Sequence, residues 1–590
     1  MKKLFSKNDS KTLGRVLRYI GKYKFFLPLS ILFALITTAL SLYIPILIGD
    51  AIDLIVGVGN VDLGGIFDIL IRAAALILVS ALCSWLMSII NNRITFHIAR
   101  DIRNDAFEKI KTLPLSYIDG TPHGDIVNRV INDTDRFSEG LLLGFTQVFT
   151  GVLTILGTLF FMLFINWQIA LVVVFLTPLS IFIAKFIGKR TFTMFKARSE
   201  AEAEQTALID EMVANQKLIR AFGYEERAKE RFDSCLDRLG AATLKAIFFS
   251  SLTNPTTRFV NNVVYATVAL VGAIMVMETK ELGAMAFTIG EFSVLLSYTN
   301  QYTKPFNEIS GIFAEFQDAL ASAERVLNLI DEKSEPSDDT DARVLKDIKG
   351  DVKIADVEFS YSKEKPLIKD FNLDVMAGEK IAIVGPTGCG KTTLINLLMR
   401  FYDVDSGKIE VDGMDVKRVT RKSLRASYGM VLQDTWLKAG TVRENIAFAN
   451  PEATDDMVIA AARAAHAHGF IKRLKNGYDT VLGEGGEGLS QGQRQLISIA
   501  RVMLSMPEML ILDEATSSID TRTEMKIQDA FSEMMRGRTS FIVAHRLSTI
   551  RTADKILVMK DGRIIETGTH DELLARGGFY SELYNSQFAH

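Results

Sequence analysis

The chain has 590 residues, which is too long for a single hydrophobic core, so we expect at least two domains. Its formal net charge is only -3 and no basic face stands out along its length, which argues against nucleic acid as a partner. The three cysteines, Cys83, Cys235 and Cys389, are far apart and lack metal-ligand spacing, so they indicate neither a disulfide framework nor a zinc site.

Hydrophobic residues make up 48% of the chain and are concentrated in its first 306 positions. A helix needs about 20 apolar residues to cross a bilayer. The first run of that kind is too long for a signal peptide and lacks a cleavage site, so we expect it to remain as the first span. For the fifth run alone, a buried helix of a large soluble protein is the alternative. Arg258 in that run either is satisfied within the helix bundle or lines a transport pathway, because charge inside a membrane is costly. The six predicted spans are Phe25–Gly49, Ile66–Ile90, Leu142–Ile165, Gln168–Ile187, Ile247–Met277 and Phe287–Phe306.

Lysine and arginine are distributed unevenly among the segments between these spans. The segments 1–24, 91–141 and 185–245 carry eight, seven and twelve of them, and the intervening loops carry none, none and one. Positive charge is retained on the cytoplasmic side, so we expect a multi-pass protein of the cell membrane with both termini in the cytoplasm. The two longer basic segments have helical periodicity and are expected to extend the spans into the cytosol.

An acidic, proline-containing stretch, Asp331–Asp341, follows the apolar half and predicts a solvated linker. We therefore divide the chain into a basic N-terminal segment (1–24), a transmembrane domain with two long cytoplasmic loops (25–324), a linker (325–349) and a soluble domain (350–590).

A phosphate-binding motif lies early in the soluble domain. Ile381–Val384 is a short apolar strand, and the sequence Gly385–Thr392 and a helical pattern follow it directly, which is the context of a P-loop. Glycines let backbone N–H groups wrap phosphates, Lys391 reaches the β- and γ-phosphates, and the Thr392 hydroxyl can coordinate Mg²⁺. Residues 350–590 are therefore predicted to be a nucleotide-binding domain. We assign no catalytic role to the thiol of Cys389 in the P-loop. The predicted nucleotide contacts of this loop are Gly385, Pro386, Thr387, Gly388, Cys389, Gly390, Lys391, Thr392 and Thr393.

Two adjacent carboxylates follow a second apolar strand, Met509–Leu512. The strand predicts burial on both faces, and α/β sheets place ligands at the carboxyl ends of such strands. Asp513 suits the Mg²⁺ shell, and Glu514 can orient or deprotonate the water that attacks the γ-phosphate.

From Leu113 to the C-terminus, the chain resembles the ATP-binding-cassette exporters, specifically half-transporters with the membrane domain fused ahead of the nucleotide domain. The motifs that carry the resemblance are Tyr361, Gln433 in Val-Leu-Gln-Asp-Thr, Leu489-Ser-Gln-Gly-Gln493, Ser517–Asp520 and His545 in Val-Ala-His-Arg-Leu. Gly483–Gly486 and the loop motifs Leu113–Asp125 and Lys217–Phe222 indicate the exporter subclass, and these loops would contain the coupling helices.

The resemblance implies roles for these residues. Tyr361 would stack adenine, Gln433 would sense Mg²⁺ and the membrane domain, and His545 would bridge the γ-phosphate and Glu514. The expected catalytic residues are Glu514, His545 and Gln433, and the expected Mg²⁺ ligands are Thr392, Gln433 and Asp513.

The signature implies a dimer. Ser490 can cap the helix that follows it, and the N-terminus of that helix would offer an anion site. The resemblance implies that Ser490, Gly492 and Gln493 complete the ATP pocket of a partner chain. Gln491 replaces the first glycine of the usual Leu-Ser-Gly-Gly-Gln, as in one partner of heterodimeric exporters, so we favour a heterodimer over a homodimer.

We therefore predict an all-α, six-helix transmembrane domain followed by an α/β P-loop ATP-binding-cassette domain. The expected function is export by alternating access, driven by ATP with Mg²⁺ as cofactor, of a hydrophobic small molecule, drug or lipid. The alternatives are an importer or a nucleotide-gated regulatory membrane protein on the same scaffold.

Overall fold

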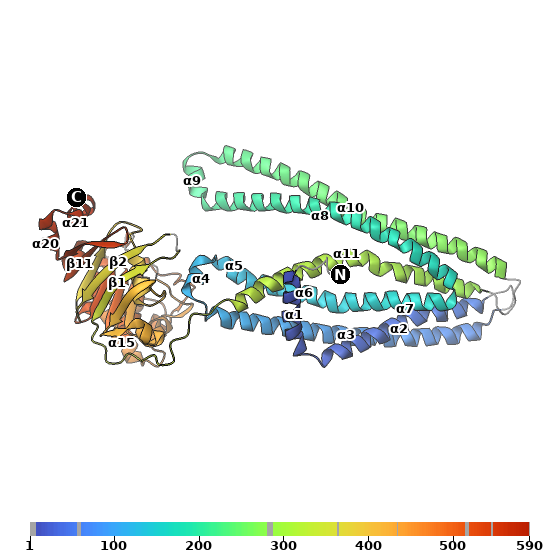
Figure 1. Cartoon of the computed structure of the whole chain (residues 1–590), viewed down its shortest axis with the longest axis horizontal. Coiled ribbons are helices and arrows are strands. Elements are labelled where there is room, and N and C mark those ends of the chain that lie inside the picture. The colour runs from blue at the N-terminus through green and yellow to red at the C-terminus, as the bar shows by residue number, and fades with distance from the viewer. Residues whose placement is uncertain are drawn as a thin grey trace. The chain divides into compact units, whose positions relative to one another are not determined.

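The computed structural model divides the chain into two compact units (Figure 1). The first contains Met1–Leu113 and Thr121–Glu332, and the second contains Pro114–Gly120 and Lys333–His590. The second unit therefore includes a short piece of the segment between the second and third predicted spans. The structure describes residues 7–55, 61–279, 287–362, 365–432, 435–513, 519–543 and 547–588.

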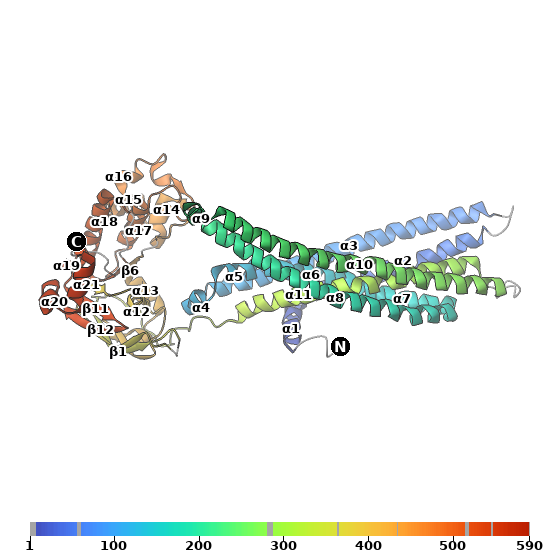
Figure 2. The ribbon, with the colours of Figure 1, turned by 90° about the horizontal axis from the view of Figure 1, so that it is seen from above.

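The described secondary structure of the first unit is all helical, as predicted, and α8 (Trp167–Ala214) and α10 (Glu225–Thr279) run side by side (Figure 2). Short π-helical segments, Arg129–Asp133 and Gly144–Val148, flank α6. The helices are α1 (Lys7–Gly21), α2 (Phe26–Asp53), α3 (Leu63–Ile110), α5 (His123–Asn128), α6 (Thr134–Leu143), α7 (Phe149–Ile165), α8 (Trp167–Ala214), α9 (Gln216–Ala221), α10 (Glu225–Thr279) and α11 (Ile289–Asp331).

Five of the predicted spans lie largely in α2, α3, α8, α10 and α11. The third, Leu142–Ile165, begins at the end of α6 and crosses the π-helical segment Gly144–Val148 before it reaches α7. By length and composition, α2, α3 and α10 can cross a membrane, and α7 and Trp167–Leu179 of α8 are shorter apolar helices. The helices α3, α8 and α10 have 48, 48 and 55 residues, which is far more than a bilayer requires. The prediction that spans continue as long helices is therefore confirmed.

The core of the first unit joins α2, α7, α8, α10 and α11 through buried apolar side chains. Leu42, Met162, Ile169 and Leu295 belong to this core. Tyr298 is also buried there, and its hydroxyl donates a 2.6 Å hydrogen bond to the Leu42 carbonyl oxygen. The single polar atom of this large ring is thus satisfied inside an apolar cluster.

The second unit contains a six-stranded sheet with the order β12-β11-β3-β10-β9-β6, parallel except for β12. A four-stranded antiparallel sheet has the order β2-β1-β4-β5, and β7 pairs with β8. The strands are β1 (Val352–Phe359), β2 (Ile368–Val375), β3 (Lys380–Val384), β4 (Ser406–Val411), β5 (Met414–Asp415), β6 (Tyr428–Val431), β7 (Gly440–Thr441), β8 (Val481–Leu482), β9 (Met509–Asp513), β10 (Thr539–Val543), β11 (Lys555–Lys560) and β12 (Arg563–Gly568).

Strand β9 shows why the six-stranded sheet is the centre of this unit. Leu510 and Leu512 pack in one hydrophobic cluster, and Met509 and Ile511 pack in the cluster on the opposite face. The predicted burial on both faces is therefore confirmed. The helices of this unit are α4 (Leu115–Gly120), α12 (Lys391–Leu398), α13 (Arg421–Ala426), α14 (Val442–Ile446), α15 (Asp455–Ala464), α16 (His468–Ile471), α17 (Gln491–Ser505), α18 (Thr521–Met535), α19 (Leu547–Arg551), α20 (His570–Arg576) and α21 (Phe579–Phe588).

The predicted linker differs from expectation in two ways. Helix α11 continues to Asp331, so the first residues of the predicted linker, 325–331, are helical. Further on, the buried Arg421 guanidinium pairs with Asp338 at 3.0 Å, and Arg425 pairs with Glu335 at 2.5 Å. The prediction of a solvated linker is therefore wrong for these two carboxylates, because arginines of α13 hold them against the second unit.

Candidate functional site

Four neighbouring parallel strands end at one edge of the six-stranded sheet. Val543 at the end of β10 pairs with Ile383 of β3 and with Asp513 of β9, and β6 pairs with β9 in the same direction. The carboxyl ends of parallel strands are where α/β sheets bind ligands. The segments that follow these ends carry the P-loop and the predicted residues Gln433, Glu514 and His545, and those three residues lie outside the described part of the chain.

The predicted P-loop is a glycine-rich turn between β3 and α12. Gly388 and Gly390 have φ angles of +83° and +107°, a region in which other residues are strained. A Cβ atom on Gly385 would lie 2.2 Å from the Met559 carbonyl oxygen, so a side chain does not fit there. No side chain caps α12, which leaves the N–H groups of its first turn for an anion. The loop therefore fits a phosphate group.

Lys391 is the cation of this loop. Its ammonium donates to the carbonyl oxygens of Gly385 and Pro386 at 2.8 and 3.0 Å, and it lies 3.9 Å from Sγ of Cys389. These partners are neutral, so the positive charge remains to attract a phosphate. Burial raises the pKa of the Cys389 thiol, which favours its protonated form.

Tyr361 stands beside α12 with 51% of its surface exposed, so an aromatic base can stack on it. Its hydroxyl donates to Oγ1 of Thr393 at 3.3 Å and accepts from Nδ2 of Asn396 at 3.2 Å. Its ring packs edge-on against Phe359 and Tyr402, with centroids 4.9 and 5.0 Å apart. The structure thus places Tyr361 next to the P-loop helix, in edge contact with two other aromatic rings.

The donor set for Mg²⁺ is small. Thr392 is exposed in the first turn of α12, and Asp513 is partly buried at the end of β9. In the described part of the chain, no group of three His, Cys, Asp or Glu residues could hold a metal ion. Mg²⁺ at nucleotide sites is held by one or two protein oxygens together with phosphate oxygens. These two residues fit that pattern.

The signature segment begins helix α17. The Ser490 hydroxyl accepts a 3.3 Å hydrogen bond from the Gln493 N–H, and the Gln493 side chain accepts one of 3.0 Å from the Ser490 N–H. The predicted cap is confirmed. Gly492 packs so closely on α18 that a Cβ would lie 2.4 Å from Cγ2 of Thr523. Gln491 does not have a positive φ, so the backbone there does not require glycine.

Asp520 begins α18 as its N-cap. Its carboxylate accepts a 2.9 Å hydrogen bond from the Thr523 N–H, and this bond lowers the pKa of Asp520. The predicted dimer-contact segment therefore ends in a helix cap, whereas Ser517 and Ser518 lie outside the described residues.

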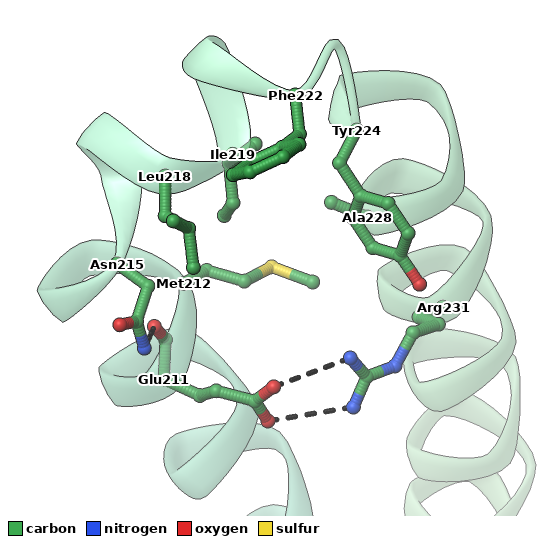
Figure 3. Close-up of a pocket in the computed structure, with 9 residues that line it drawn as sticks. All are labelled: Glu211, Met212, Asn215, Leu218, Ile219, Phe222, Tyr224, Ala228 and Arg231. Carbon is green, nitrogen blue, oxygen red and sulfur yellow. Dashed lines mark hydrogen bonds and ion pairs between the residues drawn. The ribbon is translucent and has the colours of Figure 1, made fainter.

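The predicted second cytoplasmic loop turns at α9, between α8 and α10, and Figure 3 shows the residues that line a pocket there. A pocket of about 450 Å³ lies beneath this turn, far along the chain from the P-loop motifs. Glu211 and Arg231 close one side with paired hydrogen bonds of 3.3 and 3.4 Å. Leu218 and Phe222 are 57% and 77% exposed, so the tip presents apolar surface. The lining residues are Glu211, Met212, Asn215, Leu218, Ile219, Phe222, Tyr224, Ala228 and Arg231.

Sequence reasoning did not identify Tyr402 and Asn396 as neighbours of Tyr361. No local pattern marks them, because Tyr361 follows β1 and the other two residues lie in and after α12. Asn396 lies five residues after the P-loop lysine, in the helix that follows the P-loop. This short distance in the sequence is the one signal that could have pointed to it as a neighbour of the nucleotide site.

Comparison with known proteins adds three findings. Residues 27–306 match the family profile of the ABC transporter transmembrane region, and residues 368–517 match that of the ABC transporter. A fatty acid ABC transporter ATP-binding/permease protein of Mycobacterium bovis is 41% identical over 524 residues, or 89% of this chain and 82% of that protein. An ATP-dependent lipid A-core flippase of Syntrophus aciditrophicus is 36% identical over 512 residues, 87% and 84% of the two chains. A solved bacterial Atm1-family ABC exporter with ATP bound aligns with a TM-score of 0.76 and 28% identity over 96% and 98% of the chains.

Proposed function

The chain belongs to the ABC transporter family as an exporter half-transporter, and on this premise we propose that it exports lipids or fatty acids with long acyl chains. It is a multi-pass membrane protein whose ABC domain binds ATP and couples the ATPase to transport. The observation that supports the substrate class is that two relatives are a fatty acid transporter and a lipid A-core flippase. Fatty acids and lipid A, which those two names give as substrates, both contain acyl chains.

The proposed roles in ATP hydrolysis follow the order of the strand ends. Glu514, directly after β9, orients or deprotonates the attacking water, and His545, two residues after β10, contacts the γ-phosphate and that glutamate. Mg²⁺, when bound, would neutralise phosphate charge, and Thr392, Gln433 and Asp513 are its proposed ligands. The P-loop and Tyr361 hold the nucleotide.

Half-transporters of this kind dimerise, and we propose that the partner is a homologous chain rather than a second copy. The capped N-terminus of α17 and the tight Gly492 contact support a working signature that completes the partner's ATP pocket. Gln491 is the reason to favour a heterodimer. Expression of the chain alone and together with its genomic neighbour tests this, and a stable self-dimer with full substrate-stimulated ATPase activity would contradict it.

The exporter family to which the chain belongs moves its substrates outward. The lysine and arginine distribution is the reason to propose that both termini lie in the cytoplasm. The alternative hypotheses are that the protein is an importer or that it is a nucleotide-gated regulatory protein. Inverted vesicles that contain the protein should accumulate substrate when ATP is added outside. Loss of preloaded substrate would favour import, and the absence of ATP turnover would favour the regulatory reading.

The substrate class is tested with the purified transporter in lipid nanodiscs. We expect long-chain fatty acids or acyl lipids to stimulate ATP hydrolysis more than short-chain acids or soluble drugs of equal charge. A matched series of C6, C10 and C16 acids separates acyl length from the carboxylate. Equal stimulation by all three would remove the acyl chain as the recognised feature.

A further inference from the structure

A direct hydrogen bond joins α4 to the nucleotide-binding part of the second unit. The Tyr402 hydroxyl donates to Oδ2 of Asp119 at 2.6 Å. This length is typical of a hydroxyl bound to an ionised carboxylate, which is stronger than a bond between neutral groups. Burial, and then the bond to Asp119, raise the pKa of Tyr402, so the hydroxyl keeps its proton and remains a donor.

The same side chain contacts the proposed adenine site. The ring of Tyr402 packs edge-on against Tyr361 at 5.0 Å and against Phe359 at 5.6 Å. Tyr361 in turn is bonded to Thr393 of the P-loop helix. One aromatic side chain therefore touches the base-stacking tyrosine with its ring and α4 with its hydroxyl.

The backbone that carries Tyr402 is firmly held. Helix α12 begins at Lys391, and Arg400 follows its end with φ +50°. The buried Arg400 guanidinium donates to the carbonyl oxygens of Val416 and Val419 at 2.8 and 3.2 Å. The Arg425 guanidinium lies 5.0 Å from the centre of the Phe401 ring. The backbone at Tyr402 is thus held against α12, the helix that follows the P-loop. If Asp119 moves away, the backbone of Tyr402 cannot move with it to keep the hydrogen bond.

We propose that Tyr402 is a positioning residue that couples adenine binding at Tyr361 to the order of α4, through its hydrogen bond to Asp119. A base stacked on Tyr361 restricts that ring, and the edge contact then fixes the Tyr402 hydroxyl. A hydrogen bond weakens steeply when its geometry is lost, so the bond to Asp119 reports the state of the site. Helix α4 is covalently continuous with the membrane unit at both ends. The proposal rests on the assignment of Tyr361 to adenine and of this chain to ATP-driven transport.

The experiment is backbone hydrogen exchange of residues 115–120 in the full transporter in nanodiscs, with and without ATP and with Mg²⁺ removed to prevent hydrolysis. We expect ATP to slow exchange in α4 at least threefold in the wild type. Tyr402→Phe keeps the ring contacts and removes only the hydroxyl, so the ATP effect on α4, measured at ATP concentrations that saturate each variant, should be lost. Asp119→Ala should give the same loss, and the double variant should show no additional loss.

A matched control is Tyr428→Phe, because the Tyr428 hydroxyl is buried and has no hydrogen-bond partner among the described residues. It should leave the ATP effect on α4 intact. Persistence of the ATP effect in Tyr402→Phe, or full additivity of the two single variants, would overturn the proposal. The readout does not depend on the transported molecule, so a failure of the acyl-lipid proposal would appear separately, as absent stimulation in the wild type.

Discussion

The apolar helices of the membrane unit and the sheets of the second unit differ in how they satisfy buried threonine hydroxyls. In the membrane unit, threonine hydroxyls donate to carbonyl oxygens one turn back in the same helix, as in Thr158 to Thr154 at 2.6 Å and Thr177 to Val173 at 2.7 Å. In the second unit the buried Thr539 hydroxyl donates to Gly350, which is 189 residues away. Within a bilayer no water can hydrogen-bond to a polar group, and a carbonyl oxygen one turn back in the same helix is always within reach of a threonine hydroxyl. In the second unit such a hydroxyl can instead join segments that are distant in the sequence.

Glycine follows the same division. Gly49 of α2 and Gly290 of α11 let two helix backbones approach, and a Cβ on Gly290 would lie 2.2 Å from the Gly49 carbonyl oxygen. In the second unit, Gly390 instead provides a left-handed conformation at the P-loop. Small residues allow close helix contacts in membranes, whereas positive φ shapes binding turns. The membrane unit is therefore expected to respond to changes in volume, and the second unit both to changes in volume and to changes in individual functional groups.

Glu514→Gln is expected to have the largest effect. It should reduce ATP hydrolysis about 100-fold or more while ATP still binds, because only the group that activates water is lost. Steady-state ATPase assays and equilibrium binding of a fluorescent ATP analogue measure the two quantities. Unchanged turnover would remove Glu514 from its proposed role.

Lys391→Ala should instead weaken nucleotide binding itself, because the ammonium that neutralises the phosphates is lost. We expect the dissociation constant for ATP to rise about 10-fold or more, with hydrolysis falling in parallel. Lys369→Ala, which changes a lysine on β2, serves as a control for the loss of one positive charge. Full ATP affinity in Lys391→Ala would mean that the loop is not the phosphate site.

Gly290→Val tests the volume limit of the membrane unit. The added atoms would collide with the Gly49 carbonyl oxygen and with Asp53, whose carboxylate accepts a 2.7 Å bond from the Gly290 N–H. Overpacking of this kind costs about 1–3 kcal/mol, so the thermal midpoint in detergent should fall by several degrees. Gly240→Val is the matched control, since nothing lies within 4 Å of its Cβ position in α10. An equal response of both variants would refute the close-contact explanation.

Gly492→Ala tests whether the second unit also has a volume-limited glycine. The new methyl group would lie 2.4 Å from Cγ2 of Thr523, and we expect a loss of about 1–2 kcal/mol and reduced ATPase activity. Thr523→Ser removes that methyl group and should restore much of the stability. Failure of Thr523→Ser to rescue would show that Gly492 is needed for approach to the nucleotide rather than for packing.

Asp520 should give the smallest effect, and it depends on pH. The hydrogen bond from the Thr523 N–H lowers the pKa of Asp520 in the folded chain. The ionised cap therefore contributes its full stability to the fold above the unfolded pKa of about 3.9, and this contribution is lost as the pH falls through the folded pKa. Asn also caps helices but does not titrate. The thermal midpoint of Asp520→Asn should therefore fall less between pH 6 and pH 3 than that of the wild type. Parallel pH curves for the two proteins would contradict this.

The sequence by itself determined the features that depend on neighbouring residues. Six apolar runs located the helices of the first unit, because the length of a span follows from bilayer thickness alone. The P-loop between β3 and α12 and the Ser490 cap were also predictable, since their partners lie within a few positions of one another. The order of the motifs was enough to indicate the transporter family.

Only the tertiary structure decided which distant segments meet. The pairing of Arg421 with Asp338 in the linker joins residues 83 positions apart, and the bond between Tyr402 and Asp119 joins residues 283 positions apart. Neither has a periodic or spacing signal, because each depends on how whole sheets and helices pack. The same holds for Gly290, whose need to be glycine comes from the backbone of α2 lying against it. Contacts between distant residues exist only once the packed elements have brought their backbones together, so sequence patterns confined to one element cannot reveal them.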